Sequence, residues 1–227
     1  MSDWSTDRRR IVRDAIGVAL AVSLYGVSFG ALATTAGLDV TQALALSTLT
    51  FTGGTQFALV SVIGAGGTAV TAIATALLLG ARNALYGLRL APILKVHGRR
   101  RLLAAHLTVD ESTAMALAQT DERRSRLAFW ATGTGIFVCW NIAMVVGAIG
   151  ARVVGDPTRL GLDAAIPAAL LALVWPQLKN RRTILVAIGA AAAALALTPL
   201  VTPGLPVLLA ASVAIVMAWP ERAGGDV

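Results

Sequence analysis

The chain has 227 residues, of which 56% are hydrophobic and 14% are charged, and its mean hydropathy is +0.74. These values exclude a soluble globular domain and predict an integral membrane protein. The net charge of +7 does not indicate nucleic-acid binding, because the Lys and Arg residues gather in the gaps between apolar runs, as they do in cytoplasmic loops.

The apolar runs are long enough to cross a hydrocarbon core of roughly 30 Å as α-helices, and the sequence lacks the short alternating segments of a β-barrel. We therefore expect an all-α polytopic helical bundle. The sequence has no Cys/His cluster for a metal, no phosphate-binding loop and no nucleophile triad pattern. We accordingly expect no metal, no cofactor and no enzymatic reaction.

In chain order, residues 1–14 carry four arginines and form a basic segment that we expect in the cytoplasm. The apolar run 15–38 is longer than a signal-peptide core and is expected to be the first spanning helix. Residues 15–220 are interpreted as one transmembrane transport domain, and residues 221–227 as a short tail.

Residues 40–81 contain no charged residue and no histidine, and they are too long for one span. The glycines at 64–67 predict a break, with a second helix beginning near Thr68 and ending near Leu94. The last apolar run is expected to divide where prolines remove backbone donors, at 198–206. The remaining apolar segments are 102–120, 127–151, 164–178 and 183–220.

The sequence is consistent with either about eight or about seven membrane-spanning segments. Eight crossings put the arginines at 99–101 outside. A re-entrant or peripheral segment 102–120 gives seven crossings and puts the N-terminal arginines outside instead. Neither count brings every basic cluster to one side, which is the result expected when a helix is discontinuous or half-spanning.

The short motif Gly37-Leu38-Asp39 recurs at residues 161–163. It indicates either an internal repeat of the kind found in transporters or a coincidence. Asp39 and Asp163 each precede an apolar run, so we interpret both first as helix N-caps.

The sequence Phe-Thr-Gly-Gly-Thr-Gln-Phe at residues 51–57 places polar groups inside an apolar run. Adjacent glycines allow a membrane helix to unwind, and freed backbone groups at membrane depth line a cavity or are buried in protein. One interpretation is a discontinuous helix that binds a polar solute. The other is a tight helix crossing with the glutamine bonded across it. The candidate binding residues are Thr52, Gly53, Gly54, Thr55 and Gln56.

The helix expected at 68–94 carries a polar stripe that includes Arg82, Asn83 and Tyr86. An arginine at membrane depth is costly, so Arg82 either faces a cavity or a carboxylate, or reaches the membrane surface by snorkelling. Asp110 and Glu111 are the acidic pair of segment 102–120. If buried, they are candidates to pair with Arg82 or to carry a coupling proton; on a surface helix they are merely solvated.

Taken together, these motifs resemble the AzlC family of branched-chain amino acid exporters. The resemblance covers nearly the whole chain in the same order. The stretches that carry it are residues 26–33, 36–38, 51–57, 82–92, 107–111 and 160–168.

The resemblance implies the large subunit of a two-component exporter in the bacterial cytoplasmic membrane, acting with a small AzlD-like membrane subunit. It also implies outward transport of leucine, isoleucine, valine and sometimes methionine. The chain departs from the usual Asn-x-Arg-His pattern of the family, since Gly80 and Asn83 flank Arg82 and the histidine is missing. The alternatives are a passive channel for small polar solutes and an assembly subunit without transport of its own.

Overall fold

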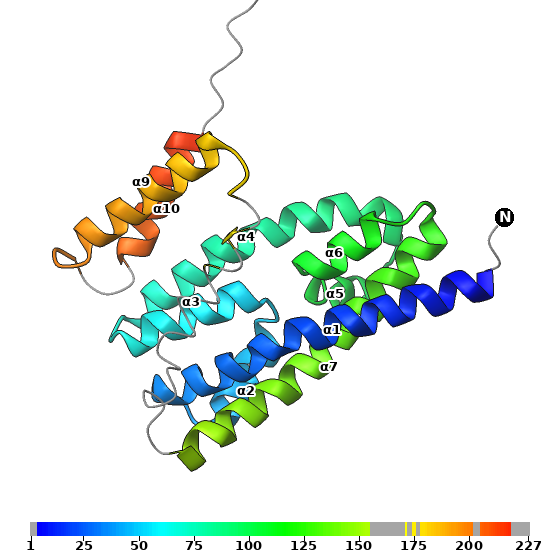
Figure 1. Cartoon of the computed structure of the whole chain (residues 1–227), viewed down its shortest axis with the longest axis horizontal. Helices are drawn as coiled ribbons and strands as arrows, with labels where there is room; N and C mark the ends of the chain where they lie inside the picture. Colours follow the sequence, from blue (N-terminus) through cyan, green and yellow to red (C-terminus); the bar gives the residue numbers. More distant parts are fainter. Residues whose placement is uncertain (1–3, 155–170, 172–173, 176–177, 202–204, 219–227) are drawn as a thin grey trace, which may run out of the picture.

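The structure is a computed structural model that describes residues 4–154, 171, 174–175, 178–201 and 205–218 (Figure 1). The regular elements in this part of the chain are helices, as the composition predicts, and no strand occurs in it. The helices are α1 (Trp4–Thr35), α2 (Val40–Leu49), α3 (Gly53–Gly64), α4 (Ala69–Leu94), α5 (Arg99–His106), α6 (Asp110–Leu117), α7 (Glu122–Val154), α9 (Arg181–Leu197) and α10 (Leu205–Ala218).

Among the described residues, α1, α4 and α7 are long and apolar enough to cross a membrane. At 1.5 Å per residue, α4 is about 39 Å long, whereas α2 and α3 are about 15 and 18 Å long. The predicted segment 102–120 is not one helix, because α5 and α6 are eight residues each, about 12 Å. Each of these helices alone is too short to cross the hydrocarbon core.

Several predicted boundaries are confirmed. A break separates α3 from α4 at the expected glycines, α4 ends at Leu94, and α9 and α10 divide the last apolar run. Asp39 is the N-cap of α2, and its Oδ1 accepts a hydrogen bond of 2.8 Å from the Gln42 amide. The basic N-terminal segment is itself helical, since α1 begins at Trp4. Asp163 and most of the predicted segment 164–178 lie outside the described residues.

Helices α1 and α7 lie side by side and run in the same direction. At their N-terminal ends the Arg123 guanidinium lies 3.8 Å from the centre of the Trp4 ring. Further along, a Cβ added to Gly26 would lie 2.9 Å from the Trp140 carbonyl oxygen. A Cβ added to Gly30 would lie 2.7 Å from the Ala148 amide nitrogen. The GxxxG spacing in α1 therefore serves close helix packing, as expected in a membrane.

Helices α2 and α3 form a hairpin that enters from the end of the molecule where α1 finishes. Helix α2 begins there, and α3 returns there, since a Cβ on Gly64 would lie 3.1 Å from the Ala36 Cβ. Helices α5 and α6 form a second hairpin at the opposite end, between the last residue of α4 and the first of α7. Figure 1 shows the two hairpins toward opposite ends of α1.

The tips of the two hairpins meet near the middle of α7. Phe51, at the first tip, has its ring centre 5.8 Å from that of His106, at the second tip. Both rings also contact Phe137 of α7, at 5.1 and 5.6 Å. Two interruptions in the helical backbone, at residues 50–52 and 107–109, are thereby brought to the same depth in the molecule.

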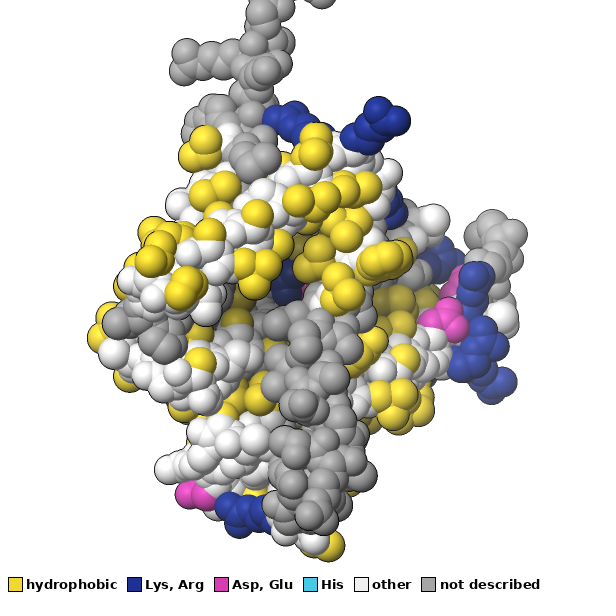
Figure 2. Space-filling view, turned by 60° about the vertical axis from the view of Figure 1, so that its left-hand side comes forward, with side chains coloured by type: hydrophobic (Ala, Val, Ile, Leu, Met, Phe, Trp, Pro, Cys, Tyr) yellow, Lys and Arg dark blue, Asp and Glu magenta, His cyan; other side chains and the backbone are white. Residues whose placement is uncertain are grey.

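Charged contacts join α1, α4 and α7 at one end of the molecule. Asp7 pairs with Arg124, and Lys95 Nζ lies 2.6 Å from Glu122 Oε1. Arg126 Nε donates a 2.8 Å hydrogen bond to the Ile93 carbonyl. The N-terminal arginines, the cluster after α4 and the cluster that begins α7 therefore share one end. Figure 2 shows a large group of basic and acidic side chains at its right-hand edge, smaller charged groups at the top and bottom, and hydrophobic side chains over much of the face between them.

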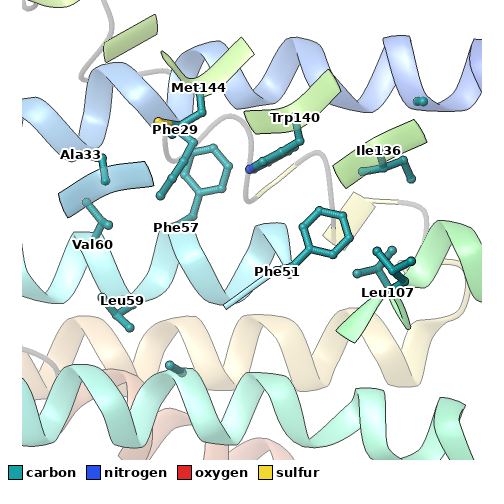
Figure 3. Close-up of a cluster of buried hydrophobic side chains, with 14 of the residues drawn as sticks. Phe29, Ala33, Phe51, Phe57, Leu59, Val60, Leu107, Ile136, Trp140 and Met144 are labelled. Carbon is teal, nitrogen blue, oxygen red and sulfur yellow. The ribbon is translucent and has the colours of Figure 1, made fainter. Parts of the chain in front are cut away.

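A hydrophobic core fills the space between α1, α3 and α7 (Figure 3). Phe29 packs edge-on against Phe57, with ring centres 5.5 Å apart, and stacks on Trp140 at 6.2 Å. Met144 is also fully buried there. This core holds α3 against the two parallel helices and so fixes where the first hairpin tip lies. Helices α9 and α10 pack against each other, and α10 contacts α4.

Candidate functional site

A cavity of about 80 Å³ lies where the hairpin tips meet. One water needs about 10–15 Å³ by this measure, so the cavity has room for several waters or a small organic solute. Arg82, on its wall, is near the middle of α4, about 20 Å from the first residue of that helix and about 18 Å from the last. The cavity is lined by Val22, Tyr25, Phe51, Thr52, Gly53, Gly54, Phe57, Arg82, Val109, Asp110, Glu111, Ile136 and Trp140.

The Arg82 guanidinium pairs with Asp110, with Nη2 and Oδ2 2.8 Å apart. The predicted pairing is confirmed, and snorkelling to the membrane surface does not describe Arg82. The second carboxylate oxygen, Asp110 Oδ1, is buried and has no hydrogen-bond partner in the described part of the chain. A buried acceptor without a partner is costly, so this oxygen is available to a donor that enters the cavity.

The N-terminus of α3 forms one wall of the cavity. Thr52 is its N-cap residue but its side chain makes no capping hydrogen bond. The amides of Gly53 and Gly54 belong to the first turn, whose N–H groups have no intrahelical partner. The backbone leaves the helical conformation just before the two glycines, at residues 50–52. Gly53 permits close approach, because a Cβ there would lie 3.1 Å from the Trp140 ring.

The N-terminus of α6 forms the facing wall, and it begins with Asp110 and Glu111. Ser112 fixes this tip: its Oγ donates to the Leu107 carbonyl at 2.7 Å and accepts from the Val109 amide at 3.1 Å. One wall of the cavity thus offers backbone N–H groups and the partial positive charge of a helix end, which favour an anion. The other wall offers carboxylates, which favour a cation.

The rest of the cavity wall is apolar or aromatic. It is formed by Val22 and Tyr25 of α1, Ile136 and Trp140 of α7, and the two phenylalanines at 51 and 57. Sequence reasoning did not single out the residues from α1 and α7. They resemble any other apolar or aromatic residues of a membrane helix, and the sequence offers no signal that separates a side chain facing a cavity from one facing lipid.

Four of the predicted binding residues do not line this cavity. Tyr86 lies one turn beyond Arg82 and interacts with Asp110. Thr55 is buried, and its Oγ1 lies 3.9 Å from the place where a Cβ on Gly80 would be. Asn83 Oδ1 is buried without a hydrogen-bond partner in the described part of the chain.

Gln56, the fourth, is fully buried and bonded to the protein itself. Its Nε2 donates to the carbonyls of Ser47 and Thr50, each at 3.1 Å, and its Oε1 accepts from Trp140 Nε1 at 3.0 Å. For Gln56 the structure therefore agrees with the second interpretation, in which the glutamine is bonded across a tight helix crossing. Gln56 holds the end of α2 against the start of α3 and ties the hairpin tip to α7.

We expect Gln56→Leu to lower the free energy of unfolding by roughly 2–4 kcal/mol, because it leaves the Trp140 N–H and backbone carbonyls without a partner in the protein interior. Thermal unfolding of the purified protein in detergent measures the change. Gln119→Leu is the matched control, since Gln119 makes a single side-chain bond, to the Met115 carbonyl, near the surface. Equal stability of the two variants would contradict the assignment.

The three long apolar helices and their shared core define a helical integral membrane protein, with a charged cavity at mid-depth. The chain belongs to the AzlC family: the model of that family, described as AzlC protein, matches residues 17–154, more than half of the chain. The family is associated with branched-chain amino acid transport. No curated protein and no solved structure matches the chain.

Proposed function

We propose that the protein is the transport subunit of a secondary exporter of branched-chain amino acids in the bacterial cytoplasmic membrane. The observation that carries the proposal is the mid-depth cavity between two hairpin tips, with helix amides on one wall, carboxylates on the other and apolar side chains between them. A free amino acid with a branched apolar side chain has the same three parts. Membership of the AzlC family supports the same substrate class.

In the proposed binding mode the substrate carboxylate lies at the N-terminus of α3, where Gly53 and Gly54 donate backbone hydrogen bonds. The substrate ammonium lies at the Asp110 Oδ1 atom that has no partner in the described part of the chain, beside Glu111. Arg82 pairs with the other oxygen of Asp110 and so holds this carboxylate at the cavity wall. The side chain of the substrate packs against the wall that includes Trp140.

The arrangement also supports alternating access. The two hairpins enter from opposite ends and end at the same cavity, so displacement of either tip would open the cavity toward one side only. Broken helices at a central binding site are the usual construction of such transporters. The chain has no nucleotide-binding loop, so we propose an ion gradient as the driving force, with Asp110 or Glu111 as the coupling group. Asn83 stands where the family usually has a histidine, so this position supplies no titratable group for the coupling.

We further propose that the basic end of the molecule faces the cytoplasm, following the positive-inside tendency. With α1, α4 and α7 as crossings, and with each hairpin returning to the side from which it enters, every basic cluster up to Arg126 lies at that end. The proposed partner is a small AzlD-like membrane subunit.

Export of preloaded amino acids tests this function. Cells that express the protein with its small partner should export leucine, isoleucine or valine saturably, and an uncoupler of the proton gradient should reduce the export severalfold. Methionine is measured beside them, and empty cells and cells lacking the partner are the controls. Flux that neither saturates nor responds to the uncoupler would identify a passive channel. No export with any partner would identify an assembly subunit.

A further inference from the structure

A second hollow lies on the outside of the molecule, between the second half of α4 and the hairpin helix α5. Its volume is about 580 Å³, and it is separate from the mid-depth cavity, with which it shares no lining residue. The lining residues are Ala84, Gly87, Leu88, Leu90, Ala91, Leu94, Lys95, Val96, His97, Arg101, Ala104, Ala105 and Thr108. We refer to it as the α4–α5 groove.

The floor of the α4–α5 groove is apolar and built largely from small residues. A Cβ added to Gly87 would meet no atom within 4 Å, so the groove is open at that point. The hydroxyl of Thr108, at the inner end, donates a 2.7 Å hydrogen bond to the Ala104 carbonyl and is thus satisfied within the protein. The floor therefore suits a hydrocarbon chain better than a polar solute.

The length of the groove corresponds to one leaflet of a bilayer. From Ala84 to Leu94 it follows eleven residues of α4, about 16 Å, and half of a hydrocarbon core is about 15 Å. Its outer rim lies at the basic end of the molecule, where α4 ends and α5 begins. With the basic end at the membrane surface, as proposed above, the rim would lie at the depth of lipid headgroups and the inner end near the membrane centre.

The rim of the groove is cationic. Lys95 is already paired with Glu122, whereas Arg101 makes no ion pair in the described part of the chain. An arginine remains charged at any relevant pH and forms strong bidentate bonds with phosphate. Basic pockets beside membrane helices on the cytoplasmic side are suited to anionic lipid headgroups.

We propose that the α4–α5 groove binds an anionic phospholipid, with one acyl chain along α4 and the phosphate at Arg101. The lipid covers the outer face of α4 on the side of the hairpin formed by α5 and α6. This site does not depend on the identity of the transported solute.

Lipid binding is tested on the full chain purified in detergent, with phosphatidylglycerol or phosphatidylcholine added. Native mass spectrometry counts bound lipid, and thermal unfolding measures stabilisation. We expect severalfold more phosphatidylglycerol than phosphatidylcholine to be retained, and Arg101→Gln to remove most of that preference. Arg100→Gln is the matched control: it changes the same charge on the same helix but lies outside the groove.

A second pair of variants tests the groove itself. Gly87→Leu fills the open space and should lower phosphatidylglycerol retention severalfold without loss of stability. Gly17→Leu also adds a side chain where nothing lies within 4 Å, but on α1, and should change nothing. The proposal is overturned if Arg101→Gln and Arg100→Gln behave alike, or if both lipids are retained equally. It is also overturned if a photoreactive residue at Gly87 labels the small partner subunit instead of lipid.

Discussion

Arg82→Gln is expected to reduce export at least ~30-fold while the protein still reaches the membrane. The substitution removes the cation paired with Asp110 and leaves a carboxylate at membrane depth without its partner. A ~30-fold loss corresponds to a loss of about 2 kcal/mol of interaction with the transported solute. Without Arg82, the Asp110 carboxylate is also no longer held where it can meet the ammonium group of the substrate.

The measurement is the initial rate of export divided by the amount of protein in the membrane. Arg89→Gln is the matched control, because Arg89 lies two turns further along α4 and does not line the cavity. Normal export by Arg82→Gln, at normal membrane levels, would remove Arg82 from the site.

Two further variants, Asp110→Asn and Arg82→Gln/Asp110→Asn, distinguish an effect on substrate binding from an effect on folding. Asp110→Asn should also abolish export, since it removes the charge proposed to meet the substrate ammonium. The double variant Arg82→Gln/Asp110→Asn has no unpaired charge and should regain normal membrane levels and stability without regaining export. If the double variant restores export, the pair is only structural and the proposed binding mode is wrong.

Gly30→Ala is expected to prevent accumulation of folded protein. A Cβ at this position meets the Met144 carbonyl and lies 2.7 Å from the Ala148 amide nitrogen, both of them backbone atoms of α7. An added methyl group in a packed core lowers the free energy of unfolding by roughly 1–3 kcal/mol when neighbouring side chains can move aside. Here only separation of α1 from α7 relieves the overlap, so the cost is larger. Separation would also disrupt the stack of Phe29 on Trp140 and the cavity wall beside it.

Membrane level and thermal unfolding temperature are the readouts for Gly30→Ala. The control is Gly17→Ala on the same helix, where the added Cβ meets nothing within 4 Å and helix propensity improves. The close packing of α1 on α7 would be refuted if both variants were as stable as the unaltered protein.

The candidate site was predictable from the sequence where its residues are chemically unusual. Arg82 and Asp110 stand out because charges are expensive at membrane depth, and the structure pairs them. Thr52 and the glycine pair stand out because polar and flexible residues interrupt an apolar run, and they line the cavity. Gln56 was equally conspicuous, yet its polar atoms bond within the protein. A polar side chain in a membrane helix signals burial, and its spacing does not distinguish a ligand from a structural bond.

The sequence by itself determined the membrane environment, the helical class and most helix boundaries. These depend on local properties, namely the length of apolar runs and the positions of Gly and Pro, and the boundaries at 64–67 and 198–206 follow from them. Only the tertiary structure decided that α2–α3 and α5–α6 are hairpins whose tips meet at one cavity. That meeting depends on long-range packing, as between Phe51 and His106, and hydropathy cannot distinguish a segment that crosses the membrane from one that turns back.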